Sequence, residues 1–171
     1  MLAAKGLING ITDKEYQPQT PIRRADFLIL LVETFELHVD DGSPGTSFAD
    51  VPEHVYYGRA AGIARALGIV QGDGSNRFLP SSPITREEAA VMIHRAMQVI
   101  DMPSNAESGS ALPEFKDAGA IQAYAREAVD ILMHARMLQG ANGYFHPEKT
   151  LTRAETAVLL YRLYNLLPSY M

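Results

Sequence analysis

The sequence predicts an all-α fold in which a helix–loop–helix unit occurs three times, with the first copy incomplete. Two observations support this: a short motif recurs along the chain, and the segments around it carry apolar residues at the three- and four-residue spacing of a helix face. A single helix pair cannot bury its own apolar stripe. We therefore expect a pseudo-threefold arrangement around a central three-helix bundle, to which each repeat contributes one helix.

Three segments of the 171-residue chain align on the motif. An aromatic residue stands two positions before a proline, and an aliphatic residue stands four positions after that proline. An arginine follows two positions later, and an acid two positions after the arginine. The aromatic residues are Tyr16, Phe78 and Phe145, the aliphatic residues Ile22, Ile84 and Leu151, the arginines Arg24, Arg86 and Arg153, and the acids Asp26, Glu88 and Glu155. We expect one domain over residues 1–171, with repeats at 1–37 (partial), 48–100 and 115–167 and linkers at 38–47 and 101–114.

The first helix of each complete repeat is predicted over Tyr57–Leu67 and Ala125–Ala135, where apolar residues recur at helical spacing. Glycines end both stretches, as is typical of helix C-termini. Upstream, Phe48-Ala-Asp50-Val51 aligns with Phe115-Lys-Asp117-Ala118, and Tyr56 aligns with Tyr124. Repeat one lacks this front half, because only five residues precede Gly6.

The second helix of repeats two and three is predicted to begin after a capping box, Thr85-x-x-Glu88 or Thr152-x-x-Glu155. Asp26 takes the place of these glutamates in repeat one, but Arg23 stands where the capping threonine is expected. The helix that follows, Ala25–Leu37, is unusually apolar, so we expect it to be buried on most sides.

Composition excludes several classes of function. A formal charge of −5 argues against a broad nucleic-acid interface, which is normally basic. With no cysteine, the chain has no disulfide, thiol nucleophile or thiolate-bound metal. No apolar run approaches the roughly 20 residues that cross a bilayer, and the start lacks the apolar core of a signal peptide. The histidines and serines form no metal-binding or catalytic pattern, so we expect no enzyme, no metal and no cofactor.

Repeat two resembles the S-layer homology (SLH) family in Phe48-Ala-Asp50-Val51, Tyr56, Gly68-Ile69-Val70-Gln71-Gly72, Phe78-Leu-Pro80 and Ile84-Thr85-Arg86-Glu87-Glu88. In repeat three, Leu151-Thr152-Arg153-Ala154-Glu155 is close to the family's Ile-Thr-Arg-Ala-Glu string. The resemblance implies a three-pronged spindle and non-covalent attachment of an exported protein to secondary cell-wall polysaccharide, often a pyruvylated one. It also implies an extracellular location at the cell wall or S-layer, in a monomer that does not insert into the membrane.

The resemblance further implies binding grooves that use the motif arginine, a loop glycine and an aromatic residue. Carried over to this chain, these glycan-binding residues are Arg24, Arg86, Arg153, Gly10, Gly72, Gly140, Tyr56 and Tyr124. The tyrosines replace the family's tryptophan. The residues assigned to helix caps and the structural motif are Asp26, Thr85, Glu88, Thr152 and Glu155.

The arginines also suggest an acidic ligand without the family. A cation is unfavourable at the positive end of a helix dipole by about 0.3–1 kcal/mol. Free first-turn amides beside a guanidinium would, however, hold a carboxylate. Two alternatives stay open: the arginines pair with acids of the chain in a structural role, or the repeats form a helical module for protein–protein interaction or self-assembly.

Overall fold

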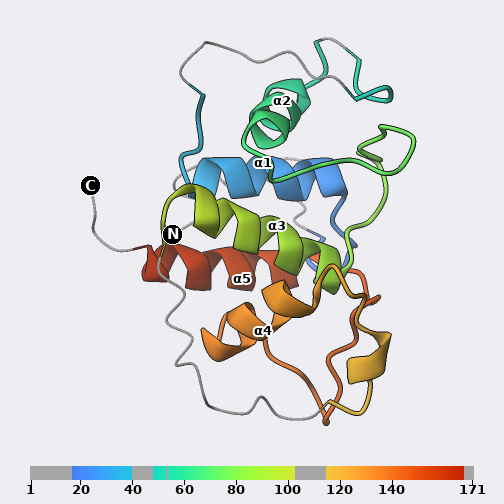
Figure 1. Ribbon diagram of the computed structural model, residues 1–171, viewed down its shortest axis with the longest axis vertical. Coiled ribbons are helices and arrows are strands. Elements are labelled where there is room, and N and C mark those ends of the chain that lie inside the picture. The colour runs from blue at the N-terminus through green and yellow to red at the C-terminus, as the bar shows by residue number, and fades with distance from the viewer. Residues whose placement is uncertain (1–16, 40–47, 53, 103–114, 168–171) are drawn as a thin grey trace. The chain divides into compact units, whose positions relative to one another are not determined.

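The structure, a computed structural model, describes residues 17–39, 48–52, 54–102 and 115–167 (Figure 1). Its helices are α1 (Arg24–Thr34), α2 (Gly58–Ala66), α3 (Arg86–Val99), the short 3₁₀ helix η2 (Ala118–Ala120), α4 (Arg126–His134) and α5 (Arg153–Leu166). The described part of the chain contains isolated β-bridges but no strand. The predicted all-α fold class is confirmed, while the pseudo-threefold arrangement and the one-domain, three-repeat organisation stay predictions.

The chain divides into two compact units. The first comprises residues 1–84 and 151–171, and in it α1 packs against both α2 and α5. The second comprises residues 85–150, and in it α3 packs against α4. In both units, the second helix of one repeat therefore packs against the first helix of the next repeat. This pairing links consecutive repeats, whereas the sequence pattern shows only the helices within each repeat.

The predicted burial of the first apolar helix is confirmed, but the helix is shorter than predicted. Phe27, Leu28 and Leu31 in α1 are fully buried. The helix ends at Thr34 and not at Leu37, because Glu36 adopts a left-handed backbone with φ of 51°. The Leu37 N–H then donates back to the Val32 carbonyl at 2.9 Å, which satisfies a carbonyl of the last turn.

Both capping boxes form. The Thr85 hydroxyl accepts from the Glu88 N–H, and the Glu88 carboxylate accepts from the Thr85 N–H at 2.9 Å. Thr152 and Glu155 do the same at the start of α5. The assignment of Asp26 to this set is wrong. Its helix has Arg23 at the N-cap without a side-chain cap bond, because an arginine offers no oxygen to the first-turn amides.

Arg23→Thr is expected to stabilise the protein by about 1 kcal/mol, since it supplies the missing N-cap oxygen. Thr85→Ala should lose a similar amount, because it removes an existing cap. Urea denaturation of the two variants and the wild type measures both changes. A lower midpoint for Arg23→Thr would contradict this account of the first helix.

Three aliphatic residues, one from each motif, form a closed cycle of backbone hydrogen bonds within the first unit. Ile22 N–H donates to the Leu151 carbonyl at 2.9 Å, Leu151 N–H to the Ile84 carbonyl at 3.0 Å, and Ile84 N–H to the Ile22 carbonyl at 3.1 Å. All three side chains are buried. The cycle satisfies three buried donors and three acceptors and joins the three motifs at one point.

Candidate functional site

In the second unit, four residues form a stack that contains two of the predicted site residues. The Arg86 guanidinium lies over the Phe145 ring, 4.9 Å from its centroid, and Phe145 contacts Phe115 with 5.9 Å between centroids. Gly140 lies against the Phe115 ring, so closely that a Cβ there would collide with it. Arg86 also donates from Nε to the Phe145 carbonyl and from Nη2 to the Gln139 carbonyl, both at 2.9 Å.

The first unit has the same stack. The Arg24 guanidinium lies over Phe78 at 5.6 Å and its Nε donates to the Phe78 carbonyl at 3.0 Å. Phe78 stacks on Phe48, with 5.6 Å between centroids, and Gly72 lies against Phe48. Phe78 and Phe145 are fully buried, so these loop aromatics pack into the core. Arg24 and Arg86 thus each hold the loop of the following repeat, so both have a structural role whatever else they do.

An aspartate holds each of these loops in place. Asp117 accepts from the N–H groups of Phe145 and His146 at 2.8 and 2.7 Å. Asp50 accepts in the same way from Phe78 and Leu79. Leu79 and His146 have positive φ values of 59° and 57°, which turn two successive N–H groups toward one carboxylate. Burial opposes ionisation of Asp117, but the two N–H donors outweigh it and lower the pKa of its carboxyl group.

The expectation of free amides at the helix starts is wrong. In α3, the N–H groups of Arg86 and Glu87 donate to the carbonyls of Lys149 and Pro147 at 3.0 and 3.1 Å, and the third amide meets the Thr85 hydroxyl. The corresponding first two amides are bonded to loop carbonyls in α1 and α5 as well. A loop of another repeat therefore occupies the place expected for an anion, and any acidic ligand must bind through side chains or other loop atoms.

The two predicted tyrosines lie at the protein surface. Tyr56 is 67% exposed and Tyr124 58% exposed, so neither is a core residue. The Tyr56 hydroxyl donates to Asp26 at 2.7 Å, and the Tyr124 hydroxyl donates to Glu87 at 3.3 Å. Sequence reasoning missed Glu87, a buried carboxylate that also accepts from the Gln122 N–H at 3.1 Å. Its position beside the capping glutamate made it look like an ordinary exposed residue.

Tyr56 is expected to ionise later than an ordinary tyrosine. Partial burial and the hydrogen bond to the negatively charged Asp26 raise its pKa to about 12. The raised pKa means that this hydroxyl stabilises the fold below pH 10 and stops doing so as the pH rises toward 12. Ultraviolet difference titration should show one tyrosine of the wild type that ionises at unusually high pH, and Tyr56→Phe should remove that ionisation. Identical titration curves would contradict the contact with Asp26.

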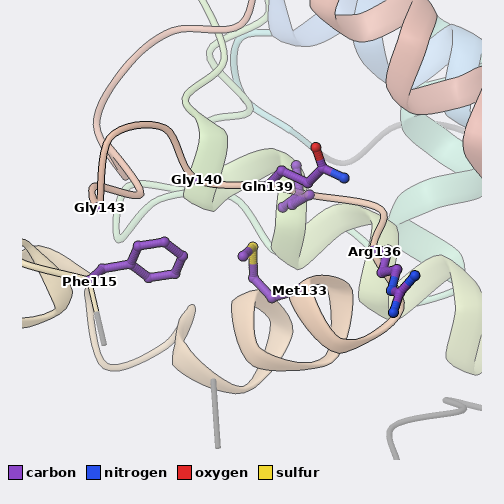
Figure 2. Close-up of a pocket in the computed structure, with 7 residues that line it drawn as sticks. Phe115, Met133, Arg136, Gln139, Gly140 and Gly143 are labelled. Carbon is purple, nitrogen blue, oxygen red and sulfur yellow. The ribbon is translucent and has the colours of Figure 1, made fainter. Parts of the chain in front are cut away.

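A pocket of about 420 Å³ in the second unit adjoins the Arg86 stack (Figure 2). It is lined by Phe115, Met133, Arg136, Leu138, Gln139, Gly140 and Gly143. Figure 2 shows Phe115 and Arg136 at opposite ends with Met133 between them. Of the predicted site residues, Gly140 lines this pocket and Arg86 bonds the carbonyl of its neighbour Gln139. Sequence reasoning missed Met133, Arg136 and Gln139. The available signal was that Arg136 stands twelve residues after Tyr124, whereas repeat two has Gly68 twelve residues after Tyr56.

The other predicted site residues are distributed elsewhere. Arg24, Gly72 and Tyr56 belong to the first unit, where Tyr56 reaches the first turn of α1 through Asp26. Arg153 begins α5, and its N–H donates to the Thr20 carbonyl at 3.0 Å. Gly10 and the aromatic residue Tyr16 lie outside the described residues.

The described residues contain no group of three or more acidic, histidine or cysteine side chains placed to hold a metal ion. Within the same residues, no helix combines the length and apolar character that crossing a membrane requires.

Comparison with known proteins identifies relatives among surface proteins and polysaccharide-degrading enzymes. The chain is 30% identical over 164 residues to an amylopullulanase of Thermoanaerobacterium thermosulfurigenes, which covers 95% of this chain and 8% of the relative. It is 28% identical over 156 residues to the S-layer protein EA1 of Bacillus anthracis, covering 91% of this chain and 17% of the relative. It is 27% identical over 165 residues to the surface-layer 125 kDa protein of Lysinibacillus sphaericus, covering 94% of this chain and 13% of the relative. The chain thus spans less than a fifth of the length of these relatives.

The family comparison agrees with the repeat pattern. A family model described as S-layer homology domain matches residues 1–28, 47–90 and 114–157, which are three segments with a shortened first one. Each segment reaches into the second helix that begins at a motif arginine. The matched segments cover more than half of the chain, and the chain belongs to the S-layer homology domain family.

Proposed function

We propose that this chain is a non-covalent anchoring module that holds an exported protein on the bacterial cell wall by binding secondary cell-wall polysaccharide. The observation that carries the proposal is the combination of family and relatives. An S-layer homology segment of about 160 residues is shared with S-layer proteins and with enzymes named for different polysaccharide substrates. Because these proteins have such different names, a common location explains the shared segment better than a common reaction does.

The module itself is proposed to be non-enzymatic. The enzyme-named relatives match over a small share of their length, 8% for the amylopullulanase and 15% for an exoglucanase of Acetivibrio thermocellus. The same segment also matches proteins whose names mention only an S-layer and no reaction. The activity in those names is accordingly assigned to the rest of each relative.

The proposed ligand is an acidic glycan of the pyruvylated type. Exposed tyrosine rings suit the apolar face of a sugar, and Tyr124 begins the segment that leads into α4. Arginine suits a carboxylate, because its guanidinium can donate two parallel hydrogen bonds. The sites proposed are those around Arg24, Arg86 and Arg153, with Gly10, Gly72, Gly140, Tyr56 and Tyr124 in the roles assigned above.

Sedimentation with purified cell-wall sacculi tests the anchoring proposal. The full chain should pellet with intact sacculi and stay in the supernatant once the wall polysaccharide has been stripped. Added free polysaccharide should compete with the sacculi. Binding that survives stripping would favour the alternative of a protein-interaction module, and no binding to intact sacculi would overturn the anchoring role.

A further inference from the structure

Repeats two and three place an arginine differently around the aromatic ring that begins each repeat. Helices α2 and α4 align over their whole length, so Arg65 corresponds to Met133 and Gly68 to Arg136. In repeat two, the Arg65 guanidinium lies 4.4 Å from the Phe48 ring centroid. It also donates to the Asn76 side chain at 2.9 Å and to the Gln71 carbonyl at 3.3 Å. The Arg65 guanidinium is therefore hydrogen-bonded to the loop of its own repeat.

In repeat three, the same place holds an uncharged methionine. Phe48 is 4% exposed under Arg65, whereas Phe115 is only half-buried and faces the pocket together with Met133. The arginine of this repeat, Arg136, stands three residues further along the chain, at the rim of the same pocket (Figure 2). The exchange of positions puts a methionine in the pocket wall where repeat two has an arginine over its aromatic ring.

Arg136 is poorly suited to its backbone position. Its φ is 56°, in the left-handed region that favours glycine, and the equivalent Gly68 has a φ of 73°. Its side chain is exposed, and within the described residues it has no hydrogen-bond or ion-pair partner. A further cation, Lys116, lies over the Tyr144 ring at 5.1 Å, and its side chain is close to Gly143 of the pocket. An exposed arginine in a strained conformation therefore adds a second cation to the edge of an open, partly apolar pocket.

We infer that the repeat-three pocket is a binding subsite for a carboxylate-bearing sugar and that Arg136 is the residue that recognises the carboxylate. The inference rests on the proposed anchoring function and assigns the acidic group of its ligand to one place in the chain. Arg136 can donate two parallel hydrogen bonds to the carboxylate, while Met133 and the exposed part of Phe115 contact the apolar face of the sugar. Repeat two offers no equivalent cation, because Arg65 is bonded to its own loop.

Two variants separate this subsite from general electrostatic attraction. Arg136→Gly removes the cation and relieves the left-handed backbone, so it should bind less tightly and yet melt at a higher temperature. The expected loss of affinity is about tenfold, as for one hydrogen bond to a charged group. Met133→Arg adds a positive charge but places a guanidinium over Phe115, as Arg65 does over Phe48. It should therefore also weaken binding, although its net charge is more favourable for an acidic polymer.

Isothermal titration of the full chain with solubilised wall polysaccharide is the measurement, with one sample intact and one freed of ketal-linked pyruvate by mild acid. The wild type should prefer the intact polymer, and Arg136→Gly should bind both samples alike. Arg59→Gln in α2, which is not a residue of the pocket lining, is the charge control and should behave as the wild type. Wild-type binding with Arg136→Gly unchanged, or Met133→Arg improved, would overturn the subsite and leave anchoring intact. No wild-type binding to either sample would overturn both proposals.

Discussion

Gly140→Ala is expected to destabilise the protein by about 3 kcal/mol, the upper end of the cost of overpacking a well-packed site. The added Cβ would meet the Phe115 ring at less than van der Waals separation and the Tyr144 carbonyl oxygen at 2.7 Å. Phe115 contacts Phe145 on one side, and the Tyr144 oxygen belongs to the backbone, so relieving both contacts requires the loop itself to shift. Because Gly140 also lines the pocket, the substitution should reduce polysaccharide binding as well.

Gly119→Ala is the matched control, since a Cβ at Gly119 would meet no atom within 4 Å. It lies in the same unit and should leave stability within about 0.5 kcal/mol of the wild type. Guanidinium denaturation followed by circular dichroism measures both variants. Equal midpoints for the two substitutions would show that the contact between Gly140 and Phe115 does not constrain the loop.

Asp117→Asn is expected to cost about 2 kcal/mol, because one of the two loop N–H groups would face an amide donor in place of a carboxylate oxygen. Those two donors are Phe145 and His146. Asp50→Asn should cost a similar amount in repeat two. Asp130→Asn, at an exposed carboxylate 3.7 Å from His134, is the control and should change stability by less than about 0.5 kcal/mol.

The effect of Asp117→Asn should depend on pH with a definite sign. The folded-state pKa of Asp117 is lowered, so its carboxylate contributes stability above the unfolded value of about 3.9. That contribution is lost as the pH falls through the folded-state pKa. The stability difference between wild type and variant should therefore be constant from pH 5 to 7 and shrink under acid, as read from denaturation midpoints in buffers of about pH 3 and pH 6. A constant difference at both values would show that the charge of Asp117 is not what holds the loop.

The local sequence pattern was sufficient to predict the helices and the residues at which they begin. The capping boxes at Thr85 and Thr152 depend on residues three positions apart, and amphipathic spacing repeats within four, so both can be recognised in a short stretch of sequence. The repeat also identified the family, because the family is defined by the order of the same motifs. The helix starts were accordingly predicted more closely than the end of α1, which depends on the left-handed conformation of Glu36.

The contacts that the motif side chains make could not be predicted from the local sequence pattern. Arg86 reaches a loop 59 residues away, and its helix amides are bonded to carbonyls of that same loop. Free amides are the natural expectation for a helix considered alone, since its first N–H groups have no partners inside it. The capping role assigned to Asp26 was wrong, because Arg23 supplies no cap and Tyr56 instead donates a hydrogen bond to its carboxylate.

The sequence by itself determined the all-α class, the helix starts and the family, since each is encoded in spacings of a few residues or in their recurrence along the chain. Only the tertiary structure decided where the pocket lies. Repeat three has Met133 and Arg136 where repeat two has Arg65 and Gly68. In the sequence, this difference is only a minor variation between repeats. Its consequence depends on whether a guanidinium lies over the aromatic ring that begins the repeat, as Arg65 does over Phe48. That contact forms only when the helix, the loop and the ring have packed together.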